Sequence, residues 1–227
     1  MFINFTKKYI FVAVPRTGST GIHKILLNLS RKNNEEFYFN NSSKEITQAT
    51  KQSTNKDFKH LTYDEIVSEF QGLSGYKMFH FVRNPYDRVA SDFFLRRRKA
   101  EKIPKKFHKR KLLWHEKVLE FKEDHKGLSV QDSFFKHCDD MYPPELRHST
   151  YNTYAGGCVN KIVCRFEDFN IQLLGVLSGF GYDVSKLNVP IINSNNVDCY
   201  DYIWSESLRD RIYKSFLQDF EDYGYDR

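Results

Sequence analysis

The chain of 227 residues contains 20 Phe and 14 Tyr, so it has enough apolar material for the core of one α/β domain and is too aromatic for a disordered chain. Its formal net charge is +6, but residues 96–111 hold ten Lys or Arg and one Glu, which gives this segment +9 and leaves −3 for the rest. No apolar stretch approaches the roughly 20 residues of a membrane span, and the first residues lack the pattern of a secretory signal. We therefore expect a protein that is cytoplasmic or otherwise soluble.

The first part of the chain predicts a buried strand followed by a helix. Residues 7–14, KKYIFVAV, form a nearly continuous apolar run with β-branched residues, as in a strand that is covered on both faces. The next segment has one apolar face at helical spacing, made by Ile22, Ile25, Leu26 and Leu29. Residues 31–59 are rich in Asn, Ser, Thr and Lys and are expected to include a mobile loop, and residues 62–70 predict a short helix.

A second buried strand, residues 76–82, runs directly into another predicted helix. Asn84 can cap this helix, and Pro85 suits its first position. Further along, the pattern predicts a third strand within residues 160–169, a helix over 170–180, and a final amphipathic segment whose apolar stripe is made by Leu208, Ile212, Phe216 and Phe220. Strands that alternate with helices predict an α/β fold with a central parallel sheet flanked by helices.

The four cysteines do not have the spacing of a metal site. They form no C-x-x-C pair, and a domain of this size does not need disulfides for stability. We therefore expect reduced thiols that serve mainly in packing, and no metal site, for Cys138, Cys158, Cys164 and Cys199.

The loop between the first strand and its helix has the composition of an anion-binding site. Its sequence, PRTGSTG over residues 15–21, places small residues, hydroxyls and one arginine where several backbone N–H groups meet a helix N-terminus. Such a loop suits phosphate or sulfate, although an ordinary strand-to-helix turn also favours Gly and Ser. It is not the phosphate loop of ATP-binding kinases, because the required Gly-Lys-Ser/Thr is missing.

Two motifs resemble the nucleotide-binding motifs of sulfotransferases that use 3′-phosphoadenosine 5′-phosphosulfate (PAPS). PRTGST, residues 15–20, is similar to the loop that wraps the 5′-phosphosulfate, and FVRNPYDRVAS, residues 81–91, is similar to the 3′-phosphate site. In the second motif the matching residues are Arg83 and Ser91. A helix rise of about 1.5 Å per residue places Ser91 about 10 Å beyond the cap, a gap that a folded-back arginine can span to share one phosphate.

Weaker motifs resemble the branch that includes carbohydrate sulfotransferases of the heparan 2-O type. They are KHLTYDEI around His60, VCRFEDF around Phe166, and the C-terminal INSNN and IYKSFLQDFEDYGYD, and they occur in the family's order. One departure is Arg16, which stands where many members carry Lys. Arginine supplies charge and hydrogen-bond donors but cannot lose its proton, so any proton-donating role at this position is in doubt.

The resemblance implies one domain over residues 1–227, with the P-loop-like architecture of sulfotransferases and nucleoside kinases. It implies PAPS as sulfuryl donor, PAP as product, no metal, and an acceptor hydroxyl, expected on a glycan. The implied cofactor-binding residues are Arg16, Thr17, Gly18, Ser19, Thr20, Arg83 and Ser91, and the implied catalytic residues are Arg16 and the general base His60. We favour structural roles for His23, Glu167 and Asp168; the alternative role for Glu167 and Asp168 is to orient catalytic groups.

The basic segment 96–111 supports an alternative function, because it matches no motif of the family. A module that binds polyanions or nucleic acid would carry such a segment with Phe107 and Trp114 interleaved or adjacent. It can equally be a solvated face, or attract an anionic acceptor such as a sulfated or uronate glycan. We favour the enzyme, do not expect nucleic acid as its partner, and expect the acceptor pocket to be built from loops in residues 31–60 and 96–155.

Overall fold

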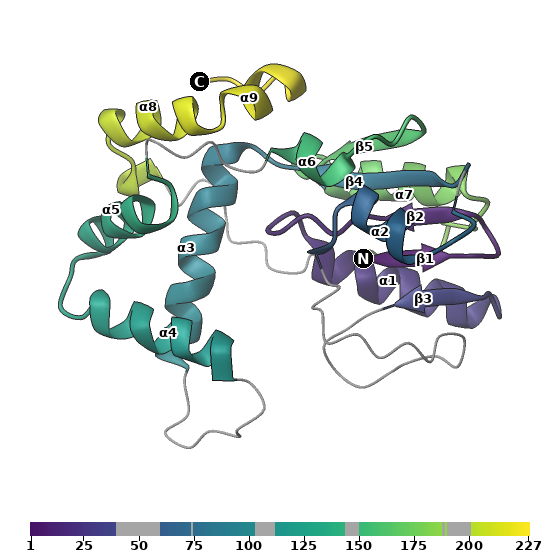
Figure 1. The fold of residues 1–227 in the computed structure, drawn as a ribbon, viewed down its shortest axis with the longest axis horizontal. Coiled ribbons are helices and arrows are strands. Elements are labelled where there is room, and N and C mark those ends of the chain that lie inside the picture. Colours follow the sequence, from purple (N-terminus) through teal and green to yellow (C-terminus); the bar gives the residue numbers. More distant parts are fainter. Residues whose placement is uncertain (40–59, 74, 103–111, 144–149, 188, 190–200) are drawn as a thin grey trace. The chain divides into compact units, whose positions relative to one another are not determined.

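The computed structural model of the chain describes residues 1–39, 60–73, 75–102, 112–143, 150–187, 189 and 201–227. It divides the chain into two compact units (Figure 1). The first consists of Met1–Arg83 and Ser149–Ser194, and the second of Asn84–His148 and Asn195–Arg227. Each unit is described by itself.

The first unit is built on a five-stranded sheet in the order β3-β1-β2-β4-β5. Its strands are β1 (Phe2–Asn4), β2 (Tyr9–Phe11), β3 (Phe37–Phe39), β4 (Lys77–Val82) and β5 (Lys161–Arg165). The three predicted strands, β2, β4 and β5, are adjacent and parallel, with Phe11 opposite Phe79 and Val82 opposite Arg165. This confirms the predicted α/β fold with helices on a sheet.

Beyond the three predicted parallel strands, the sheet has an antiparallel edge. β1 runs antiparallel to both β2 and β3, so the sheet is mixed. β1 and β2 form a hairpin whose turn passes through Lys8 at a φ of 53°, and the Asn4 side chain accepts a hydrogen bond from the Lys7 N–H at 2.7 Å. β3 lies within residues 31–59, the segment expected to include a mobile loop; residues 40–59 of that segment lie outside the described residues.

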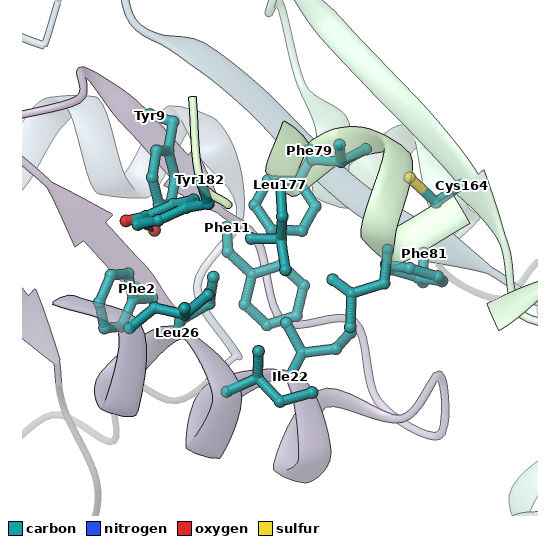
Figure 2. Close-up of a cluster of buried hydrophobic side chains, with 14 of the residues drawn as sticks. Phe2, Tyr9, Phe11, Ile22, Leu26, Phe79, Phe81, Cys164, Leu177 and Tyr182 are labelled. Atoms are coloured by element: carbon teal, nitrogen blue, oxygen red, sulfur yellow. Dashed lines mark hydrogen bonds between the residues drawn. The ribbon is translucent and has the colours of Figure 1, made fainter. Parts of the chain in front are cut away.

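Helices cover both faces of this sheet because successive strand residues point to opposite sides. On one face, α1 (Ser19–Lys32) and α7 (Phe169–Gly179) pack on Phe11 and Phe79. Figure 2 shows Ile22 and Leu26 of α1 and Leu177 of α7 converging on Phe11. On the other face, α2 (Tyr63–Glu69) and α6 (Tyr151–Ala155) contribute to a second core that includes strand residues Ile10 and Val12.

The second unit is helical among its described residues. It comprises α3 (Pro85–Glu101), α4 (Leu112–Asp124), α5 (Val130–Met141), the 3-10 turn η4 (Asp201–Ile203), α8 (Glu206–Ser215) and α9 (Leu217–Tyr223). Asn84 caps α3 as predicted: its side chain accepts a hydrogen bond from the Tyr86 N–H at 2.9 Å. The core of this unit includes the stripe predicted for the final segment, Leu208, Ile212, Phe216 and Phe220.

The final amphipathic segment forms two helices, because the chain leaves the helical path at Phe216, where φ is −118°. Residues 96–155 were expected to supply loops for an acceptor, yet their described part is largely helical, in α3 to α5 of this unit and α6 of the first.

Two further expectations concern the thiols and the membrane. Cys138, Cys158 and Cys164 are buried free thiols, as expected, whereas Cys199 lies outside the described residues. Within the described part of the chain, none of the helices has the length and apolar character needed to cross a bilayer.

Candidate functional site

The candidate site lies where the three parallel strands of the first unit end. In parallel α/β sheets, ligands bind outside the carboxyl ends of the strands. The anion loop follows β2, Arg83 follows β4 directly, and Phe166 follows β5. The Phe166 N–H donates to the Val82 carbonyl at 2.8 Å, which holds the ends of β4 and β5 together.

The anion loop has a fixed backbone conformation. Arg16 and Gly18 have positive φ angles of 70° and 80°, and the Thr17 hydroxyl donates to the Val14 carbonyl at 3.0 Å. Helix α1 starts at Ser19, and the Gly21 N–H donates to the Gly18 carbonyl at 2.9 Å. The first N–H groups of a helix have no intrahelical acceptor, and a helix N-terminus therefore favours an anion.

Gly18 is required both by its conformation and by its neighbours. A Cβ atom here would lie 2.9 Å from Phe166 Cε2 and 2.9 Å from Phe169 Cε2, which is closer than Cβ atoms approach other heavy atoms in folded proteins. A side chain at a φ of +80° would also be strained. The two aromatic rings therefore pack directly against the anion loop.

Arg83 is a buried cation beside this loop. Arg83 is only 5% exposed to solvent. Its Nη1 donates a hydrogen bond to the Arg16 carbonyl at 3.4 Å, and its guanidinium lies 4.5 Å from the centre of the Phe166 ring. Among the described residues, the buried Nε has no hydrogen-bond partner and no carboxylate forms an ion pair with Arg83. The loop, Arg83 and Phe166 thus form one continuous group in the first unit.

Tyr151 fixes the backbone of Arg83. Its hydroxyl accepts a hydrogen bond from the Arg83 N–H at 3.0 Å and donates one to the Arg83 carbonyl at 2.6 Å. Tyr151 is the first residue of α6 and is fully buried. One phenol therefore satisfies both main-chain groups of the residue that carries the buried cation.

Removing this phenol hydroxyl is expected to destabilise the first unit. Tyr151→Phe leaves a buried N–H and a buried carbonyl of Arg83 without their partner, which should lower the free energy of unfolding by about 1–3 kcal/mol. Urea unfolding, monitored through hydrogen exchange in β4, measures the loss in the free energy of unfolding. Tyr38→Phe is the matched control, since the hydroxyl of this partly buried tyrosine makes no hydrogen bond among the described residues. Equal effects of the two changes would contradict the role of Tyr151.

His60 lies at the base of the anion loop. Its Nδ1 is 2.7 Å from the carbonyl oxygen of Ala13, which lies between β2 and the loop. A carbonyl oxygen only accepts hydrogen bonds, so Nδ1 carries the proton in this contact. In the neutral ring the lone pair is then on Nε2, the form required of a base that acts through that atom.

The first unit therefore brings together most of the predicted site residues: Arg16, Thr17, Gly18, Ser19, Thr20, His60 and Arg83. Thr17 and Ser19 are buried, and Thr20 is exposed. Ser91 belongs to the second unit, where it is buried on α3, seven residues after the cap Asn84.

Two residues of this group are not among the site residues predicted from sequence. Phe166, which packs on both Gly18 and Arg83, lies in the VCRFEDF motif. Its place in that motif is a local signal for its role. Tyr151 had no local signal, because its role depends on a contact across 68 positions of the chain.

Glu167, Asp168 and His23, for which structural roles were expected, lie in environments that differ from that of Arg83. Glu167 and Asp168 are exposed, and Asp168 precedes α7 without a side-chain capping bond. His23 is buried in the core, edge-on to Phe11 with ring centres 5.2 Å apart. Within the described ranges, no group of three or more His, Cys, Asp or Glu side chains could hold a metal ion.

The basic segment is described in part. Residues 96–101 form the end of α3, where Arg96 pairs with Asp92 at 2.8 Å and Arg97 with Glu101 at 3.4 Å, both one helical turn apart. Residues 103–111 lie outside the described residues.

Comparison with known proteins agrees with this arrangement of strands, loop and cation. The model of the family described as "Sulfotransferase family" matches residues 1–226. A search of curated proteins gives no match. Because the family match extends over nearly the whole sequence, the chain belongs to the sulfotransferase family.

Proposed function

We propose that this protein transfers a sulfuryl group from PAPS to a hydroxyl group of a carbohydrate acceptor, with residues 1–227 acting as one domain. The observation that carries the proposal is the buried Arg83 guanidinium, which lies next to an anion-binding loop and has no carboxylate partner among the described residues. Family membership supports sulfuryl transfer in general. The donor and the acceptor class are the additional content of the proposal.

Arg83 would bind the 3′-phosphate of the donor. A buried cation without a counter-ion is unfavourable by several kcal/mol, and an anionic ligand offsets that cost. Phe166 covers one face of the guanidinium, while Nε remains available for a hydrogen bond. A planar guanidinium that keeps its donors and its charge is well suited to a phosphate group. Ser91 is proposed as a 3′-phosphate ligand on the resemblance of the FVRNPYDRVAS motif alone.

The anion loop would bind the 5′-phosphosulfate. Backbone N–H groups of residues 17–20 and the Arg16 side chain provide donors and positive charge where the transferred sulfuryl group and the bridging oxygen would lie. Sulfuryl transfer resembles phosphoryl transfer, in which positioning and charge stabilisation supply most of the catalysis. Because Arg16 stays protonated, we assign it charge stabilisation of the departing PAP and no proton transfer.

His60 would remove the proton of the acceptor hydroxyl. The hydrogen bond from Nδ1 to the Ala13 carbonyl orients the ring and places the lone pair of the neutral imidazole on Nε2, the atom that would act as the base. The same contact ties the base to the strand that leads into the anion loop. This arrangement supports a deprotonated acceptor oxygen attacking sulfur in line with the bond to PAP.

The carbohydrate acceptor is proposed from the branch resemblance of KHLTYDEI and the C-terminal motifs. The basic segment 96–111 would then attract an acceptor that carries sulfate or carboxylate groups, since a cluster of like charges raises the local concentration of an oppositely charged ligand.

The decisive test is the affinity for PAP, measured by titration calorimetry with EDTA present. Arg83→Ala should weaken PAP binding by about 1.5–3 kcal/mol, the usual contribution of hydrogen bonds to charged groups, which is about 10- to 150-fold. Arg83→Lys should recover only part of the loss, because it keeps the charge without the fork of donors. Binding of 5′-AMP, which has no 3′-phosphate, should be nearly unchanged by either substitution.

Arg31→Ala is the matched control, because it removes the same charge from an exposed position in the first unit. Its PAP affinity should stay within about twofold of wild type, as is usual for exposed charges. If Arg83→Ala binds PAP as tightly as wild type, or loses 5′-AMP to the same extent, Arg83 is not the 3′-phosphate ligand.

A further inference from the structure

A cavity of about 400 Å³ lies in the first unit, along helix α1 and the segment of residues 182–187. Ile25, Leu29 and Leu187 form its apolar part, and three lysines, Lys24, Lys32 and Lys186, also line it. The volume is within the range of ligand-binding pockets. None of these residues belongs to the proposed sulfuryl-transfer site.

The charge of this cavity is positive. Lys24, Lys32 and Lys186 are exposed, and among the described residues none of them forms an ion pair, although many lysines and arginines elsewhere in the structure do. The cavity has one acidic lining residue, Asp183, whose carboxylate accepts hydrogen bonds from the Ser185 N–H at 3.0 Å and the Ser185 hydroxyl at 2.7 Å. Three cations against one engaged carboxylate favour an anionic ligand.

The wall opposite α1 is held in place by a buried polar network. The Tyr182 hydroxyl donates to Glu35 Oε2 and lies 3.1 Å from the Tyr9 hydroxyl, which Figure 2 shows beside it. Asn4 Nδ2 donates to the same Glu35 oxygen at 2.7 Å. The network fixes Tyr182 to the first strands and to the end of α1, so the cavity is preformed rather than created by a ligand.

The cavity also connects to the anion loop along one exposed stripe of α1. Thr20, Lys24, Asn28 and Lys32 follow each other at four-residue intervals, and all four are exposed. Residues four apart lie on adjacent turns, about 6 Å apart along the helix axis. A ligand chain with one group at Thr20, beside the proposed sulfuryl group, can therefore place anionic groups at the lysines.

From this continuity we infer that the cavity binds the sulfate or carboxylate groups of an anionic acceptor glycan, away from the hydroxyl that reacts. The inference rests on the proposed function for the nature of the acceptor. It assigns Lys24, Lys32 and Lys186 to acceptor recognition, with the apolar part packing against the sugar rings. A ligand unrelated to the reaction, such as an acidic peptide, would not need a stripe that leads to the anion loop.

The test measures the affinity of a heparin-derived tetrasaccharide for the full chain saturated with PAP, at low salt. Lys24→Gln/Lys32→Gln/Lys186→Gln should weaken binding at least about tenfold, and the affinity should depend less on salt than in wild type. The matched control is Lys8→Gln/Lys77→Gln/Lys161→Gln, which removes the same charge from exposed lysines of the same unit. This control should change affinity by less than about threefold.

The outcomes separate this inference from the proposed function. A wild-type chain that does not bind PAP contradicts the proposed donor, whatever the lysine variants do. PAP binding with equal tetrasaccharide affinities in wild type and the cavity variant, or equal losses in both triple variants, overturns the cavity assignment alone. An oligoglutamate peptide is the third probe: if it binds the cavity more tightly than the tetrasaccharide does, the occupant is an acidic peptide and the glycan assignment is overturned.

Discussion

Replacing His60 with alanine is expected to lower kcat by about 10²- to 10⁴-fold, the usual contribution of a general base. The reason is geometric: Nδ1 is committed to the Ala13 carbonyl at 2.7 Å, so the neutral ring has its lone pair on Nε2. Without that base, the acceptor hydroxyl must lose its proton to water. PAP affinity should stay close to wild type, because His60 is assigned to the acceptor and not to the nucleotide.

The pH dependence gives this prediction a second measurement. Protonation of His60 removes the lone pair, so the wild-type rate should fall on acidification along a single titration, and the fall should be missing in His60→Ala. Steady-state kinetics with PAPS and a glycan acceptor over a pH series measure both effects. If the rate falls on acidification in the wild-type enzyme but not in His60→Ala, the imidazole acts in the reaction as well as in the fold.

Glu167→Gln is the control for a nearby titratable group, since Glu167 is exposed at the end of β5. If His60→Ala retains more than about a third of the wild-type kcat, His60 is not the base. Glu167, Asp168 and His108, the histidine of the basic segment, would then be tested in turn.

Acidification from pH 6.5 to pH 4 is expected to destabilise both units. Burial lowers the pKa of His80 in the first unit and of His137 in the second to about 4 each. For His80 the charge of Lys161 adds to the effect of burial, whereas for His137 the nearby Asp92 carboxylate, 3.7 Å from Nε2, opposes it. Both rings are therefore neutral in the folded protein at neutral pH.

The sign of the effect follows from proton binding. An unfolded histidine has a pKa of about 6.5, so between pH 6.5 and 4 the unfolded chain binds protons that the folded chain does not. Stability is then fully present above pH 6.5, decreases as the pH falls toward 4, and levels off below the folded pKa. A shift of this size corresponds to about 3 kcal/mol for each histidine.

Substitution separates the contributions of the two units. Among the described residues, neither ring nitrogen of His80 has a hydrogen-bond partner, so His80→Leu should fold and lose the pH dependence of the first unit. Hydrogen exchange in β4 reports the stability of the first unit. The fluorescence of Trp204, which packs against the core of the second unit, reports the stability of that unit. An unchanged slope of stability against pH in β4 of His80→Leu would show that His80 does not cause the effect.

The sequence by itself determined the features that depend on local chemistry. The apolar run before PRTGST predicted β2, and the Asn84-Pro85 pair predicted the start of α3, because caps and buried strands depend on residues that are neighbours in the chain. The anion loop was predicted for the same reason: its donors come from consecutive backbone groups at one helix N-terminus. The order of these motifs was also sufficient to indicate the family.

Only the tertiary structure decided the features that depend on distant contacts. The hairpin of β1 with β2 and the pairing of β3 had weak local signals, since each strand has three residues and gains its stability from its neighbours in the sheet. The burial of Arg83 follows from Phe166 and Tyr151, which come from another part of the chain. His60 meets Ala13 across 47 positions, and Lys24 meets Lys186 at one cavity although 162 positions separate them. Local patterns specify elements and caps, whereas the environment of a charged group depends on which distant residues the fold places around it.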